Sequence, residues 1–187
     1  LVDKSKRFIL GDSKGNLTAH LYSTGDCLRK LNSHSNEITT LKIDHLNHLI
    51  ISGGWDSVLN IQKQVKGGSY ELKRTIKNLH HNKVVSLTEA SIYHNLLITA
   101  TNNNLLYIWD YEFVRLIAII KTEESSEFSC VHFINGYSIL VIAETNGKVH
   151  FLNFSRRESS YISFYRLASL SFNFPDNNPT TPGVGIY

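Results

Sequence analysis

The chain of 187 residues contains no methionine, three prolines and two cysteines. No apolar run approaches the roughly 18 residues of a membrane-spanning helix, so we expect no membrane partner. Basic residues are scattered, with no run longer than the one at residues 4–7, and the formal net charge is only +3. Because a dedicated nucleic-acid binder usually concentrates positive charge on one face, this distribution argues against nucleic acid as a partner.

The two cysteines, Cys27 and Cys130, are isolated and lack the spacing of a zinc or redox motif. We therefore expect both to be free, buried thiols in a reducing compartment, which favours a cytoplasmic protein. The sequence begins at Leu1 and shows no signal peptide. Since it also lacks methionine, we expect the natural start, with any targeting signal, to lie upstream.

Residues 96–111 carry the clearest structural pattern, two apolar runs that flank three asparagines at positions 102–104. Asparagine tolerates the left-handed backbone of a tight turn, so this stretch predicts a β-hairpin. Alternation in the second strand separates its side chains between two faces, Leu106 and Ile108 on one and Leu105, Tyr107 and Trp109 on the other.

The same hairpin pattern occurs four times along the chain. The residues that close the second strand of each copy are separated by 42, 47 and 43 positions: His20, Gln62, Trp109 and Leu152. Three positions before each of them stands an apolar residue: Leu17, Leu59, Leu106 and Val149. A turn containing Gly, Asn, Asp or Ser precedes that residue in every copy, so an internal repeat organises the chain.

Further strands are predicted on both sides of these hairpins. Segments with recurring apolar spacing precede the last three hairpins, at residues 37–43, 83–87 and 127–133, whereas the first hairpin has none before it. Similar segments follow the first three hairpins, at residues 27–31, 71–76 and 115–120. Four short strands in a period of about 40–45 residues are typical of a β-propeller blade.

The repeat resembles the WD40 family over residues 8–155. The period, the Ser-Gly-Gly-Trp-Asp run that ends at Asp56 and the Trp109-Asp110 pair carry this resemblance. It implies an all-β, WD40-type β-propeller with about four blades present, as part of a larger, seven-bladed ring. Residues 1–187 would then form a partial propeller with blades at residues 7–34, 35–79, 80–122 and 123–172, followed at residues 173–187 by a loop and the start of another blade.

The resemblance also implies a structural relay of hydrogen bonds within a blade. In the family, the relay joins a histidine before the first strand, a hydroxyl on the second, an aspartate in the hairpin turn and a closing tryptophan. The second blade offers His34, Ser52 and Asp56, with Gln62 in place of tryptophan. The third blade offers His80, Thr99 and Trp109, with Asn103 in place of aspartate. The fourth blade has Glu124, Asn146 and Leu152 at these positions, so no relay is expected there. A neutral imidazole can donate to a carboxylate and accept from a hydroxyl, so this role is structural and not catalytic.

Reactive chemistry finds little support in the sequence. Metal sites drawn from His80 and His81 with His94, or from His45 with His48, match no zinc spacing. The chain has no nucleophile-elbow motif, and its glycine-rich segments at residues 11–16 and 67–69 do not precede helices. We therefore expect no enzymatic activity, no metal, no cofactor and no small-molecule substrate.

A basic outer edge is predicted on the second blade, and it allows two interpretations. Five cations form it: Lys63, Lys66, Lys73, Arg74 and Lys77. It is either a solvated strand edge that deters aggregation or a surface for an acidic partner.

Propellers of this family commonly bind other proteins, so the resemblance implies a non-catalytic interaction scaffold. Three runs, residues 25–38, 108–113 and 133–140, resemble the large WD-repeat proteins of cilia and flagella. This favours a structural component of axonemal complexes, with those complexes or tubulin as partners and the cilium as its location. The alternative is a substrate-receptor or adaptor subunit of a ubiquitin-ligase or signalling complex. An enzyme built on a propeller would need several acids or a metal cluster converging on the central channel. The innermost strands, such as residues 37–43, show no such cluster.

Overall fold

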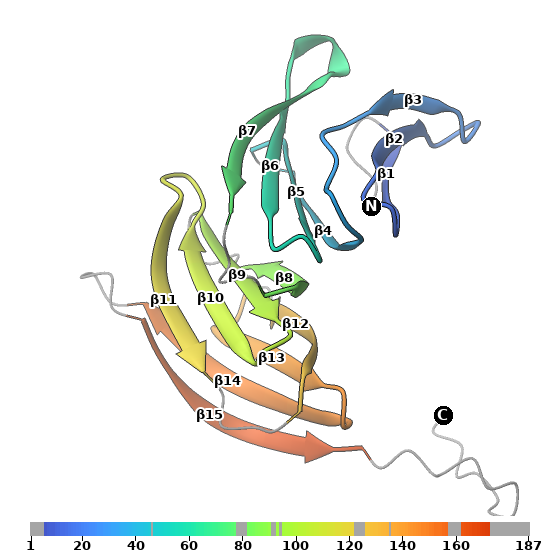
Figure 1. Cartoon of the computed structure of the whole chain (residues 1–187). Helices are drawn as coiled ribbons and strands as arrows, with labels where there is room; N and C mark the ends of the chain where they lie inside the picture. The colour runs from blue at the N-terminus through green and yellow to red at the C-terminus, as the bar shows by residue number, and fades with distance from the viewer. Residues whose placement is uncertain are drawn as a thin grey trace, which may run out of the picture.

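The computed structural model describes residues 6–45, 47–77, 82–90, 93, 95–121, 126–134, 136–156 and 162–172. These residues form four antiparallel sheets that stand side by side in an arc (Figure 1). Apart from the strands, the described residues contain one short 3-10 turn, η1 (Lys66–Gly68). None of them forms a helix with the length and apolar character of a membrane span. The predicted all-β architecture is confirmed.

Strand order follows chain order in every sheet. The first sheet has three strands, β1 (Arg7–Gly11), β2 (Leu17–Leu21) and β3 (Cys27–Lys30). The second contains β4 (Ile38–Asp44), β5 (Leu49–Gly54), β6 (Leu59–Gln64) and β7 (Tyr70–Ile76). The third contains β8 (Val84–Glu89), β9 (Leu96–Thr101), β10 (Leu105–Asp110) and β11 (Arg115–Lys121). The fourth contains β12 (Phe128–Ile134), β13 (Ile139–Glu144), β14 (Lys148–Arg156) and β15 (Ile162–Ser171).

The hairpin predicted at residues 96–111 is formed by β9 and β10. Asn104 in its turn adopts a left-handed backbone with φ of 61°, as the asparagine run requires. The predicted alternation is also confirmed, because Leu106 and Ile108 belong to the core shared with the fourth sheet, whereas Tyr107 and Trp109 belong to the core shared with the second. The third sheet is therefore covered on both faces.

Hydroxyl groups on the inner strands join neighbouring sheets. Thr40 Oγ1 on β4 accepts a hydrogen bond from the Leu87 amide of β8 at 3.2 Å. Ser86 Oγ on β8 accepts one from the Val131 amide of β12, also at 3.2 Å. The two pairs occupy equivalent repeat positions, so the same contact sets the spacing of successive sheets. The first and second sheets are linked by Arg7, which donates to the Gly68 carbonyl at 2.7 Å.

A β-bulge interrupts the pairing of the two outermost strands in each sheet, at the same repeat position. In the second sheet Ile61 pairs with Arg74 and Gln62 pairs with Leu72, which leaves Lys73 as the extra residue. A bulge places two residues of one strand opposite one residue of its neighbour and redirects their side chains. The outer strands consequently depart from simple alternation at this point.

One expectation about the cysteines is wrong. Cys27 and Cys130 are free, as predicted, but both are exposed and not buried. Each lies on a strand at the edge of its sheet, Cys27 at the start of β3 and Cys130 beside a bulge in β12. Position on an edge strand thus outweighs the usual preference of cysteine for the interior. The loop and further strand predicted at residues 173–187 lie outside the described residues.

Candidate functional site

Hydrogen bonds join the three relay residues expected in the second blade, His34, Ser52 and Asp56. His34, in the linker before β4, lies with Nδ1 2.9 Å from Asp56 Oδ1 and with Nε2 2.9 Å from Ser52 Oγ. The geometry is that of an imidazole that donates to a carboxylate and accepts from a hydroxyl. Both His34 and Ser52 are buried. The contacts tie the linker to β5 and to the β5–β6 turn.

Gln62, which stands where the family has tryptophan, holds the same linker by another route. Its Nε2 donates to the Asn32 carbonyl at 3.1 Å, and its Oε1 accepts from the Asn32 amide at 3.1 Å. The side chain is completely buried. Both hydrogen bonds go to the backbone two residues before His34. The glutamine at the family's tryptophan position therefore attaches the linker to β6 as well. The repeat alignment marked the position but not this contact.

The third blade brings together two of its predicted relay residues. Trp109 Nε1 donates to Thr99 Oγ1 at 3.2 Å, and both side chains are buried. Asn103 instead accepts a hydrogen bond from the Thr101 hydroxyl at 2.6 Å. His80 lies outside the described residues, so its predicted contact with Thr99 stays a prediction.

The fourth blade contains a buried polar pair that the relay pattern did not predict. His150 Nε2 lies 3.1 Å from Glu144 Oε1, and its Nδ1 lies 2.8 Å from Ser169 Oγ. Of the aligned positions, Glu124 lies outside the described residues, and Asn146 accepts from the Lys148 amide in the β13–β14 turn. Polar contacts therefore join β13, β14 and β15.

A signal for the contact of His150 with Ser169 exists in the repeat alignment. His150 stands two positions before the closing residue, where the second blade has Asn60. Asn60 Oδ1 accepts from Thr75 Oγ1 at 3.0 Å, and Asn60 pairs with Thr75 in the sheet as His150 pairs with Ser169. A buried polar residue facing a hydroxyl on the outer strand is thus a recurring feature, and it is visible only when the alignment is extended beyond the relay positions.

Two carboxylates and a tyrosine meet where the second and third sheets adjoin. Tyr111 Oη lies 3.2 Å from Asp44 Oδ2 and 3.1 Å from Glu89 Oε1. Two causes raise the pKa of Glu89 above its ordinary value: burial is the larger, and repulsion from Asp44 is the second. Burial and the two acids raise the pKa of Tyr111 far above its usual range, so the hydroxyl keeps its proton. A single hydroxyl proton can serve only one of the two carboxylates at a time.

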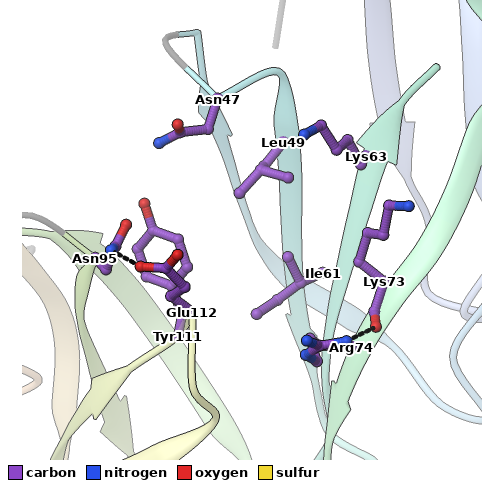
Figure 2. Close-up of a pocket in the computed structure, with 9 residues that line it drawn as sticks. All are labelled: Asn47, Leu49, Ile61, Lys63, Lys73, Arg74, Asn95, Tyr111 and Glu112. Carbon is purple, nitrogen blue, oxygen red and sulfur yellow. Dashed lines mark hydrogen bonds between the residues drawn. The ribbon is translucent and has the colours of Figure 1, made fainter.

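Beside this cluster, a cavity of about 260 Å³ opens between the second and third blades. We call it the inter-blade cavity. Figure 2 shows Lys63, Lys73 and Arg74 on one wall and Asn95, Tyr111 and Glu112 on the facing wall. Its remaining lining residues are Asn47, Leu49 and Ile61.

The charges of the inter-blade cavity are unbalanced. Three cations face a single carboxylate, that of Glu112, which accepts a hydrogen bond from Asn95 Nδ2. Lys73 also lies 3.6 Å from Glu71, but both side chains are about half exposed, so this ion pair contributes little. Of the five cations predicted to form a basic edge, Lys66 and Lys77 are exposed but do not line the cavity.

The histidines considered as metal ligands lie at exposed or undescribed positions. His45 and His48 are exposed in the β4–β5 connection, and His81 and His94 lie outside the described residues. Within the part of the chain that the structure describes, no three His, Cys, Asp or Glu side chains gather as a metal site would require.

Comparison with known proteins supports the family resemblance. The WD domain, G-beta repeat family matches residues 25–61. A curated relative, "Cilia- and flagella-associated protein 337 B" of Tetrahymena thermophila, is 24% identical over 148 residues, which cover 79% of this chain and 12% of that protein. The chain therefore spans only a small part of the length of this relative.

Solved structures share the fold at low sequence identity. A chain of the "Crystal Structure of Mitotic Checkpoint Complex" superposes with a TM-score of 0.72 and 16% identity, covering 90% of this chain and 50% of that one. The Cps50 (Swd1) β-propeller domain of Myceliophteria thermophila gives a TM-score of 0.69 and 14% identity, covering 90% and 52%. This chain thus spans about half the length of each.

The matched residues 25–61 run from the first sheet through the linker that carries His34 into β6. They include the whole hydrogen-bonded set of His34, Ser52 and Asp56. Together with the four successive sheets and the propeller neighbours, this match shows that the chain carries a WD repeat at residues 25–61 and that its sheets are the blades of a WD40-type β-propeller.

Proposed function

We propose that this chain is a non-catalytic protein-interaction module of a ciliary, axonemal assembly. The observation that carries the proposal is its similarity over 148 residues to a relative named as a cilia- and flagella-associated protein. The WD40-type fold supports the interaction role, since propellers of this type typically bind other proteins. Fold alone does not decide function, so the ciliary part depends on the relative.

The buried polar side chains are consistent with a module that performs no chemistry. His34, Asp56 and Ser52 satisfy one another within the relay. His150 is held between Glu144 and Ser169. These contacts account for the burial of both histidines, because buried polar groups need hydrogen-bond partners. We infer structural roles for all of these side chains, and also for Thr99 and Trp109.

The proposed partners are axonemal complexes or tubulin, with the cilium as the location. An acidic partner surface would attract a chain that carries a net charge of +3. In such a complex the binding energy is expected to come from a few residues among many contacts.

Fractionation of cells that express the tagged, intact protein tests this proposal. We expect recovery with axonemes that have been washed in high salt, because a structural component is held by many contacts. A diffuse pool that co-purifies with ubiquitin-ligase subunits would contradict the proposal and support the alternative role as a substrate receptor or adaptor.

A further inference from the structure

We propose that the inter-blade cavity binds an acidic segment of a partner protein through Lys73 and Arg74. This proposal rests on the proposed function as an interaction module and adds to it a binding site and the chemistry of its ligand. The evidence comes from the bulge on β7, from the equivalent position in the third blade and from the composition of the cavity walls.

The bulge explains how two neighbouring residues of one strand face the same cavity. In a regular strand, successive side chains point to opposite faces of the sheet. At the β6–β7 bulge, Arg74 pairs with Ile61, and the extra residue Lys73 has no opposite partner in the register. Both cations consequently line the inter-blade cavity, together with Lys63 from β6. Bulges commonly redirect side chains in this way beside functional sites.

The third blade has apolar residues at the bulge position that Lys73 and Arg74 occupy in the second blade. There the equivalent bulge residues are Ile117 and Ala118, with Ala118 paired to Ile108 as Arg74 is paired to Ile61. Ile117 and Ala118 are partly buried against the core that the third and fourth blades share. An apolar pair thus packs into the junction with the next blade, whereas Lys73 and Arg74 line an open cavity at the equivalent junction.

The cavity walls favour a carboxylate ligand with an apolar neighbour. Lys63, Lys73 and Arg74 provide three positive charges, and Arg74 uses one donor on the Lys73 carbonyl at 3.0 Å. A guanidinium has five N–H donors, so others can bind a carboxylate, and hydrogen bonds between ionised groups are the stronger kind. Leu49 and Ile61 add apolar surface to the lining.

The size of the cavity favours a peptide side chain over a small molecule. Its volume of about 260 Å³ is below the roughly 300–1,000 Å³ of typical small-molecule sites. One or two side chains of an extended acidic segment would fit. A nucleic-acid strand would need cations along a continuous track, and the basic residues of this chain are scattered.

Fluorescence anisotropy with the intact protein tests the proposal. The probe is a fluorescein-labelled peptide of sequence Glu-Glu-Leu-Glu-Glu, and the matched control peptide is Gln-Gln-Leu-Gln-Gln. We expect the acidic peptide to bind, the neutral one to bind at least about tenfold more weakly, and the affinity to fall with salt. Lys73→Glu with Arg74→Glu should weaken binding by at least about tenfold.

Two further variants control for charge and folding. Arg29→Glu with Lys30→Glu makes the same charge change on the exposed outer strand of the first blade and should alter binding less than about twofold. Lys73→Ile with Arg74→Ala installs the apolar pair of the third blade, so it should abolish binding while the thermal unfolding temperature is kept or raised.

Three results would overturn the assignment. The first is equal binding of the acidic and neutral peptides. The second is a loss of peptide affinity in the first-blade control variant equal to that in Lys73→Glu with Arg74→Glu. The third is full displacement of the peptide by a single-stranded oligonucleotide whose own binding is unchanged in Lys73→Glu with Arg74→Glu. If the wild-type protein fractionates with axonemes but does not bind the acidic peptide, the cavity assignment fails and the proposed function stands.

Discussion

At the scale of single residues, buried polar side chains fasten strands and linkers to one another. Thr99 is completely buried, and its hydroxyl accepts the indole N–H of Trp109 at 3.2 Å. The indole also packs in the core between the second and third blades, where its ring stacks near Tyr107 with centroids 6.1 Å apart. Trp109 therefore contributes both apolar burial and a hydrogen bond.

Replacement of Trp109 separates these two contributions. Trp109→Ala should lower the free energy of unfolding by about 3–5 kcal/mol, because it leaves a cavity in the core. Trp109→Phe retains an aromatic ring but removes the donor to Thr99, so its loss should be smaller. Denaturant unfolding measures both values. A loss under about 1 kcal/mol for the alanine variant would contradict the burial of this side chain.

Glu89 should make stability depend on pH. Its pKa is raised in the folded state by burial and by Asp44, so the folded protein holds the proton more tightly than the unfolded chain. The stabilisation is fully present below the ordinary pKa of 4.5 and is lost as the pH rises through the folded value. Glu89→Gln cannot ionise, so its stability relative to wild type should increase from pH 4 to pH 8. Urea unfolding across this range measures the difference; a constant or decreasing difference would contradict the account.

At the scale of elements, hydroxyls on the inner strands set the packing of blade on blade. Ser86→Ala should lower the free energy of unfolding by about 1–3 kcal/mol, because the buried Val131 amide loses its acceptor. Ser129→Ala, at an exposed position on β12, should change it by less than about 0.5 kcal/mol. Denaturant unfolding compares the two variants. Equal effects would show that the Ser86 hydroxyl does not join the blades.

The elements differ in how much of their structure the sequence predicts. The β9–β10 hairpin was predictable because its turn and its alternation depend on adjacent residues. The exposure of Cys130 was not, since it follows from an edge position in the sheet. The contacts of Lys73 could not be predicted either, because a bulge can be recognised only when the register of the two strands is known. The contact of His150 with Glu144 could not be predicted either, because its prediction requires knowing that both side chains are buried.

At the scale of the whole molecule, the arc of four blades leaves apolar side chains exposed on β15. Phe164, Leu167 and Leu170 are 40%, 48% and 49% exposed. Because large apolar surfaces promote association, residues 1–187 produced alone should form oligomers or aggregates. Light scattering during size-exclusion chromatography measures this. A stable monomer with one sharp unfolding transition would show that the arc closes on itself or tolerates this surface.

Cross-linking of isolated axonemes with an amine-reactive reagent, followed by mass spectrometry, tests the central claim most directly. Lys73 at the inter-blade cavity has a side chain 45% exposed and is accessible to the reagent. An interaction module bound in the axoneme should yield cross-links from Lys63 and Lys73 to another axonemal protein. In the Lys73→Ile with Arg74→Ala variant, Lys63 remains, and its cross-links to that protein should become fewer. Cross-links confined to this chain, or absence of the protein from the axonemes, would contradict the account.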